Sequence, residues 1–573
     1  MPDCSFLALV FFGLLIIHIV VSPLAWVGDE PSYCFQGVGL FSNLTFLPSD
    51  ARWHDFLARS DLAAPGTNAG QTLVGKPYRS LAPSLVGGAA LATLGLEPAR
   101  WLNCVLGFVG IVLLLSILKS SFGGTADPWR SAGLPAYFSI TATAFSLPLL
   151  AYLKLLYPEV PLFVAVCATF ASLRARASHQ TIAWAVLLPF VYIRALPLAF
   201  GFAGLTLLQQ YRNGARPRVL LSLVALFVSG LSLFAFYQLK VFGQLNGGVF
   251  APYTPSLRLL PERLGMQMFD VRHGLVAYSP IFLVGFAGLI LGAARRVPAC
   301  VDAAVLLSCY VLTFIWSTAS ESWTARFWVA GLPFVAVGLC YWLRSVNDLT
   351  AYAAAGVLTC VTLANSVLFT LMPMAFLGNR KGPLTYSILF KTIPVHLGLF
   401  LPVDGADAPV PVYARPVPYL LAFAVLTVGM LVLCTALQGR SVRRLAGLIA
   451  LVLTLVPFAV CAARAAPADT YSISVQPDGN GIKIHLHQIT THISAVQMDD
   501  TFLRNWWGPG APNALSIRCY DRSGGMEQRV ESSRALFAVL DCVREIDVEG
   551  LGITGSGHFF DGVRNVTLIQ RLL

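Results

Sequence analysis

Long apolar runs separated by short polar turns fill the first 465 residues of this chain. A helix of about 20 residues crosses a hydrocarbon core of about 30 Å, and most of the runs approach that length. Only 12% of the 573 residues are charged, whereas soluble domains carry about 25%. We therefore expect an all-α polytopic membrane protein. The thirteen expected spans are residues 6–27, 101–119, 131–152, 159–173, 181–193, 195–210, 219–241, 275–294, 299–316, 327–343, 350–371, 417–437 and 445–463.

The first apolar run is expected to remain in the protein as a span. No basic region precedes it and no A-x-A-like cleavage site follows it, so it differs from a secretory signal peptide. A weaker run at residues 81–96 is rich in Gly, Ala and Pro. We interpret it as an interfacial or re-entrant segment within the first long loop, residues 28–100.

The net charge of +11 follows the positive-inside pattern of membrane proteins, and it does not indicate a nucleic-acid partner. With a cytoplasmic N-terminus, six short turns on the inner side hold thirteen basic residues. Counting residues 81–96 as a further span would reverse most of these turns. We expect a bacterial plasma membrane as the location. The basic residues of these turns are Lys119, Arg130, Arg174, Arg176, Arg212, Arg216, Arg218, Arg295, Arg296, Arg344, Arg440, Arg443 and Arg444.

The chain changes character after residue 465. Segments such as TYSISVQ and GIKIHLHQI alternate in polarity, and polar turns such as PDGNG and DRSGG separate them. This pattern predicts a small β-sandwich-like domain at residues 466–573, facing the extracytoplasmic side. Cys519 and Cys542 lie in this region and could form a disulfide. No CxxC pair or His/Cys cluster indicates a metal site, although a requirement for a divalent metal stays open.

Two adjacent acids, Asp29 and Glu30, follow the first span in the stretch VGDEPSYCFQG. Charged groups near a bilayer are rare enough to suggest function, and a carboxylate here can take the proton of an incoming hydroxyl as a general base. The alternative is a solvated pair at a helix end. Glu159, in LYPEVPL, stands at the start of the fourth expected span. Its alternative role is an acid stabilised by the helix dipole.

Basic residues on the same expected face can hold an anion. Arg194 separates two short apolar half-spans in PFVYIRALPL, where a guanidinium is costly unless it meets a polar cavity or an anion. Arginine suits phosphate because its N–H groups bind bidentately; snorkelling towards lipid headgroups is the alternative. Further candidates on this face are Arg272, Arg326 and Lys76 for a phosphate, and Tyr33, Arg79, His273 and Glu321 for other parts of a substrate.

Five motifs follow one another in a recognisable order: GDEPSY, YPE, the arginine of the broken hairpin, FDVRHGLVAYSP and WSTASESWTARFWVAGLPF. Over about residues 1–345, this order resembles the GT-C superfamily of integral membrane glycosyltransferases. The chain is most similar to the bacterial branch of protein O-mannosyltransferases and lipid A aminoarabinose transferase. It departs from that branch where YRSLAP replaces an HGPG-like turn and WSTASESW replaces WWGGW. Both departures bear on the choice of acceptor.

The resemblance implies a sugar transfer on the extracytoplasmic face. The donor would be a sugar on a polyprenyl phosphate, the acceptor an envelope glycan, lipid or protein, and Asp29 the catalytic base with Glu30 beside it. Glu159 corresponds to a second acid of the family and Arg194 to a basic residue. The absence of a Rossmann or P-loop motif favours a lipid donor over a nucleotide sugar. Alternatives are a ligase for lipid-linked saccharides, a non-catalytic scaffold, or a transporter or flippase, for which repeated halves would be expected.

Overall fold

The computed structural model describes residues 2–20, 33, 36, 96–122, 133–243, 245, 260–269, 274–316, 325–346, 349–371, 427–432, 444–452 and eight strands between residues 471 and 570. Backbone contacts divide the chain into two compact units. The described helices belong to the first unit, and the described strands belong to the second.

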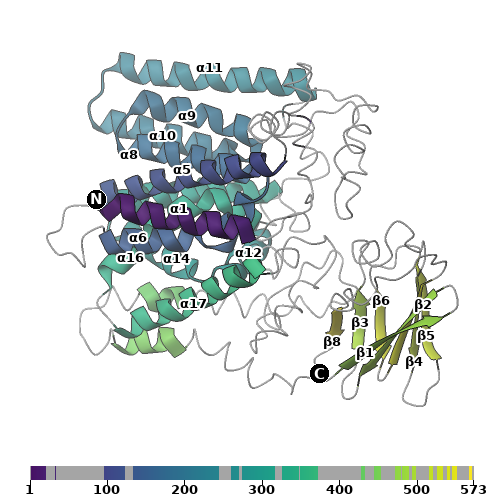
Figure 1. Cartoon of the computed structure of the whole chain (residues 1–573). Helices are drawn as coiled ribbons and strands as arrows, with labels where there is room; N and C mark the ends of the chain where they lie inside the picture. Colours follow the sequence, from purple (N-terminus) through teal and green to yellow (C-terminus); the bar gives the residue numbers. More distant parts are fainter. Residues whose placement is uncertain are drawn as a thin grey trace. The chain divides into compact units, whose positions relative to one another are not determined.

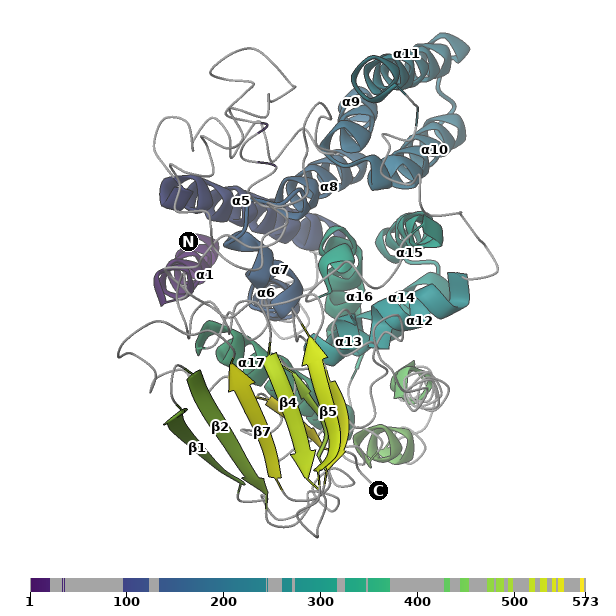
Figure 2. The ribbon, with the colours of Figure 1, turned by 90° about the vertical axis from the view of Figure 1, so that its right-hand side faces the viewer.

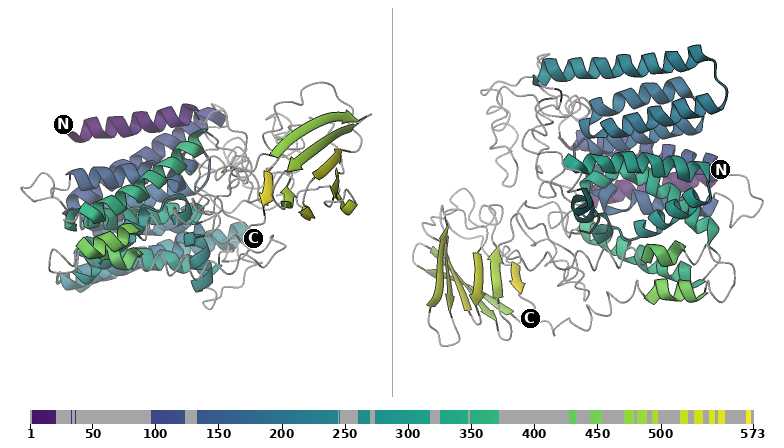
Figure 3. Two further views of the ribbon diagram at one scale, coloured as in Figure 1. Left: turned by 90° about the horizontal axis from the view of Figure 1, so that it is seen from below. Right: turned by 180° about the vertical axis from the view of Figure 1, so that it is seen from behind.

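The first unit is a bundle of helices that lie side by side with roughly parallel axes (Figures 1 and 3). Helix α11 lies at one edge and packs on α9 (Figure 1). In chain order the elements are α1 (Pro2–Val20), α5 (Leu96–Phe122), α6 (Gly133–Ala144), α7 (Leu147–Leu153), α8 (Glu159–Arg174), α9 (Ser178–Val191), η2 (Ile193–Ala195), α10 (Leu196–Arg212), α11 (Pro217–Phe242), α12 (Leu260–Phe269), α13 (Leu275–Tyr278), α14 (Phe282–Ala294), α15 (Pro298–Val311), η4 (Leu312–Trp316), η6 (Arg326–Gly331), α16 (Leu332–Ser345) and α17 (Leu349–Leu371).

Several of these helices have the length and composition of membrane spans. Among the described residues, five helices qualify, and up to seven do if each of two bent pairs counts as one span. Large apolar side chains point outward from α1 and α11, for example Phe12, Leu221 and Phe236. Such a surface would be a liability in water, but it is the natural surface of a helix in lipid. The expectation of a helical membrane protein is therefore confirmed.

The backbones of helices α14 and α16 approach each other very closely at glycine residues. A Cβ added to Gly288 would overlap the carbonyl oxygen of Gly338, and one added to Gly338 would overlap the carbonyl oxygen of Gly285. Small residues let two helix backbones come together in this way, which is a common basis of helix association in membranes. The contact holds α14 against α16, and α16 continues directly from η6, which carries part of the candidate site.

The second unit contains two antiparallel sheets. Figure 2 shows the larger one, with the strand order β1-β2-β7-β4-β5; the smaller has the order β6-β3-β8. In the β1–β2 pair, Tyr471 lies opposite Gln488 and Asp478 opposite Gly481. The strands are β1 (Tyr471–Asp478), β2 (Gly481–Gln488), β3 (Ile493–Gln497), β4 (Leu515–Tyr520), β5 (Met526–Ser532), β6 (Ala538–Cys542), β7 (Glu545–Gly550) and β8 (Thr567–Gln570).

Candidate functional site

Four of the residues proposed from the sequence are described, and their side chains come together in the buried interior of the helical bundle. These are Tyr33, Glu159, Arg194 and Arg326. Each is nine-tenths buried or more. The remaining candidates, Asp29, Glu30, Lys76, Arg79, Arg272, His273 and Glu321, lie outside the described residues.

Glu159 and Arg326 form a buried ion pair. Glu159 is the first residue of α8, and Arg326 is the first residue of η6. The guanidinium Nε donates to the carboxylate Oε1 across 2.5 Å, and the two side chains are 10% (Arg326) and 3% (Glu159) exposed. The second carboxylate oxygen, Oε2, has no hydrogen-bond partner among the described residues. Glu159 therefore orients the guanidinium through one oxygen, while its other oxygen is buried.

The chain segment before Glu159 is held by the side chain of Asn103 on α5. Its amide donates to the backbone carbonyls of Leu155 at 2.8 Å, Tyr152 at 3.0 Å and Leu153 at 3.4 Å. These carbonyls lie at and just beyond the end of α7, where the regular hydrogen bonds of the helix stop. A polar residue buried in a span is costly unless its hydrogen bonds are satisfied. Here the amide offsets that cost and fixes the turn that leads into α8.

Arg194 enters the site from the break between α9 and α10. Tyr192 adopts an extended conformation there, and the short 3-10 turn η2 carries the guanidinium. That guanidinium lies 4.2 Å above the ring of Phe327 and 5.8 Å from the ring of Tyr192. Its charge acts electrostatically on Glu159. Two guanidinium groups and one carboxylate thus share a space from which most water is excluded.

Tyrosines line this space, and together with the charged residues they form what we call the Glu159 cluster. The Arg326 guanidinium lies 4.6 Å above the ring of Tyr157, which contacts the ring of Tyr33 at 5.8 Å. The Tyr310 hydroxyl donates to the carbonyl of Phe327 and so anchors η6. The members of the Glu159 cluster are Glu159, Arg194, Arg326, Tyr33, Tyr157, Tyr192 and Tyr310.

Of these tyrosines, only Tyr33 was singled out by the sequence analysis. The sequence does contain a signal for two others, because Tyr157 stands two residues before Glu159 and Tyr192 two residues before Arg194. A tyrosine at that spacing from a charged residue at a helix end has an amphipathic ring available beside the charge. The remaining tyrosine, Tyr310, lies within an apolar run and has no such signal.

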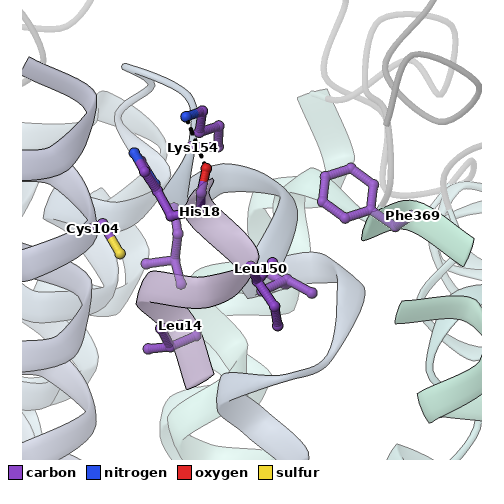
Figure 4. A pocket seen from close by; sticks show the side chains of 8 residues that line it. Leu14, His18, Cys104, Leu150, Lys154 and Phe369 are labelled. Carbon is purple, nitrogen blue, oxygen red and sulfur yellow. Dashed lines mark hydrogen bonds between the residues drawn. The ribbon is translucent and has the colours of Figure 1, made fainter. Parts of the chain in front are cut away.

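A second polar network lies beside a small pocket between α1, α5, α7 and α17 (Figure 4). The Lys154 ammonium donates to Glu97 at 3.0 Å and to the backbone carbonyl of His18 at 3.1 Å, near the end of α1. Burial holds the pKa of Lys154 below its ordinary value, although the hydrogen bond to Glu97 acts in the opposite direction. The pocket is partly open and has a volume of about 10 Å³, and its lining is mostly apolar, with three leucines, Ile17, Cys104 and Phe369 beside His18 and Lys154. The network fastens α1 to the turn before α8.

The Glu159 cluster suits an anionic ligand better than a metal ion. Guanidinium groups bind phosphate and carboxylate bidentately, and a buried site strengthens such contacts. Within the described ranges, no three His, Cys, Asp or Glu side chains gather in a way that could hold a metal ion. No protein-family model, no curated protein and no solved structure matches this chain.

Proposed function

We propose that this protein is an inverting membrane glycosyltransferase of the GT-C type. It moves a sugar from a polyprenyl-phosphate donor to an envelope glycan, lipid or protein acceptor on the extracytoplasmic face. The observation that carries the proposal is the convergence of Arg194 and Arg326, which are 132 residues apart in the chain, around one buried carboxylate. An enzyme that releases a lipid phosphate needs such cations where the negative charge develops.

Chain connectivity supports Asp29 as the general base. Tyr33 belongs to the cluster through its contact with Tyr157. Four residues of chain reach at most about 14 Å even when fully extended, so Asp29 lies within that distance of Tyr33. A carboxylate on the same segment as Tyr33 can therefore serve a substrate that is bound at this cluster. Glu30, the neighbouring acid, is within the same reach.

The proposed reaction is a single displacement. The acceptor hydroxyl gives its proton to the Asp29 carboxylate, and its oxygen forms a bond to the anomeric carbon of the sugar. The bond between that carbon and the phosphate oxygen breaks, and polyprenyl phosphate leaves with the electron pair. Arg194 and Arg326 stabilise the phosphate, and Arg272 and Lys76 are further candidates for this role. No step is assigned to a metal ion.

The proposal includes a topology. Thirteen spans, a cytoplasmic N-terminus and a plasma-membrane location would put the Glu159 cluster on the extracytoplasmic side. The strands of the second unit would form an extracytoplasmic β-sandwich-like domain that presents or selects the acceptor. In support, the basic turns after α8, α10 and α14 alternate with the ends of the helices that carry the cluster.

Asp29→Asn tests the proposal in full-length protein within membranes. The substrate pair is first identified by mass spectrometry of envelope lipids and glycans from cells with and without the protein. We expect membranes containing Asp29→Asn to lose transfer while the protein is still made at normal levels. Asp302→Asn is the matched control, because it neutralises an aspartate that pairs with Arg174 at the far end of α8. Full transfer by Asp29→Asn would refute the base assignment.

A further inference from the structure

Tyr157 connects the first loop to the buried ion pair. Its ring lies under the Arg326 guanidinium at 4.6 Å and meets the ring of Tyr33 edge to face at 5.8 Å. A third ring, that of Tyr152, contacts it at the same distance. Tyr33 and Tyr157 are 3% and 4% exposed, so both contacts are made away from solvent.

The position of Tyr157 is fixed by the backbone around it. Its amide donates to the carbonyl of Leu155 at 2.9 Å, and that carbonyl also accepts from Asn103 at 2.8 Å. One residue later, the carbonyl of Pro158 accepts the amide of Leu162 in the first turn of α8. The ring therefore stands on a turn that is tied to both α5 and α8, and it offers Tyr33 a rigid partner.

Edge-to-face contact is the arrangement that aromatic rings prefer, because the positive edge of one ring meets the negative face of the other. The face of a tyrosine also attracts a guanidinium. Tyr157 uses both properties, and so it links a residue of GDEPSY to the cation that is held by Glu159. Leucine at position 157 would fill similar space without providing either contact.

We propose that Tyr33 and Tyr157 form an aromatic clamp that positions the acids of the first loop against the Glu159–Arg326 pair. This inference rests on the proposed function. The clamp residues are positioning residues: they act by setting where Asp29 stands relative to a donor that is held by the arginines. Loss of the clamp lowers the rate of the chemical step and leaves donor binding largely in place.

Kinetics of full-length variants in membranes test this role. Tyr33→Leu and Tyr157→Leu should each lower kcat about 10- to 100-fold, since small misplacements of reacting groups have effects of this size. The donor KM should change much less. Tyr33→Phe and Tyr157→Phe retain the rings and should retain kcat. The double leucine variant should be no slower than the slower single variant, because both changes break one contact.

A second readout needs no transfer activity. Cys34 directly follows Tyr33 in the chain, and its labelling by a membrane-impermeant maleimide, located by peptide mass spectrometry, reports how firmly the segment is held. Labelling should be faster in both leucine variants and unchanged in both phenylalanine variants. Tyr341→Leu is the control, because it removes a ring that pairs with Phe122 elsewhere in the bundle.

The outcomes separate the clamp from the proposed function. Wild-type labelling and wild-type kcat in Tyr33→Leu, the variant that leaves the turn before α8 intact, would overturn the clamp. Phenylalanine variants as impaired as the leucine variants would also overturn it. Faster labelling in the leucine variants, combined with full transfer by Asp29→Asn, would refute the assignment of Asp29 as the base and leave the clamp standing as a structural contact.

Discussion

Glu159 and Arg326 are 167 residues apart in the chain, yet their side chains meet at 2.5 Å in the interior of the bundle. The carboxylate stands at the N-terminus of α8, where the helix dipole favours a negative charge, and it also accepts from a guanidinium. The place at a helix N-terminus is thus the one expected for a stabilised acid, while the catalytic role of Glu159 stays a prediction. The ion pair thus links the start of α8 to the start of η6.

Breaking this pair should destabilise the protein strongly. In Glu159→Gln the charge is removed and Arg326 stays buried, which typically costs about 3–5 kcal/mol. We expect a lower midpoint of thermal unfolding in detergent, together with loss of transfer. Asp302→Asn breaks a comparable pair with Arg174, whose side chains are more exposed, and its effect should be smaller on stability and absent from transfer. Equal effects of the two substitutions would contradict a special role for the Glu159 pair.

Asn103→Ala should loosen the turn that carries Tyr157. The substitution leaves three buried carbonyls without the amide donor, and an unmade buried hydrogen bond costs about 1–3 kcal/mol. We expect reduced thermal stability and faster labelling of Cys34. Leu102→Ala changes the neighbouring residue on α5, which is exposed on the outside of the bundle, and it should leave the labelling unchanged. Unaltered stability of Asn103→Ala would argue against the hydrogen bonds.

Glycine-to-alanine substitutions should have opposite effects in two helices. Alanine normally favours a helix over glycine by about 0.5–1 kcal/mol, and Gly356 on α17 has open space around it. Gly356→Ala should therefore leave stability unchanged or raise it. Gly288→Ala should lower stability by about 1–3 kcal/mol, because overpacking forces the helices apart. Unfolding in detergent, followed for both variants, measures the difference; a stabilised Gly288→Ala would disprove the close approach of α14 and α16.

Thiol labelling of α11 tests the proposed topology. Its 26 residues cover about 39 Å at 1.5 Å per residue, which is enough to cross a membrane. In intact cells, an impermeant maleimide should label Leu245→Cys, beyond the end of α11. It should label Asn213→Cys, before the start of α11, only after the membrane is permeabilised. The parent protein gives the background from native cysteines. The reverse pattern would place the Glu159 cluster on the cytoplasmic side.

The sequence predicted the positions of several of the described helices, because apolar length and polar turns are local properties. The expected span at 159–173 corresponds to α8, which ends at Arg174, and the expected span at 219–241 corresponds to α11. The bend of 57° between α6 and α7 was not predicted. It falls within one apolar run, and its freed carbonyl at Phe145 accepts a hydrogen bond from the Ser366 hydroxyl on α17.

The sequence could not predict which residues far apart in the chain contact each other in the site. Glu159 and Arg326 were both singled out, but for separate roles in catalysis and phosphate binding. No local pattern indicates that they contact each other. Asn103 was overlooked, since a single amide in an apolar run does not reveal which carbonyls it meets. The roles of Asp29 and Glu30 stay predictions, because both residues lie outside the described part of the chain.

The close contact between α14 and α16 also limits how this protein can move. Two backbones that touch through glycines cannot slide past each other by a few ångströms without first separating, so the two helices must travel as one body. If the bundle opens to admit a bulky lipid, the helices that separate must be ones other than α14 and α16. Helix α11 packs chiefly on α9 and α10. It is therefore better placed to move relative to the rest of the bundle than α14 and α16, which stay together.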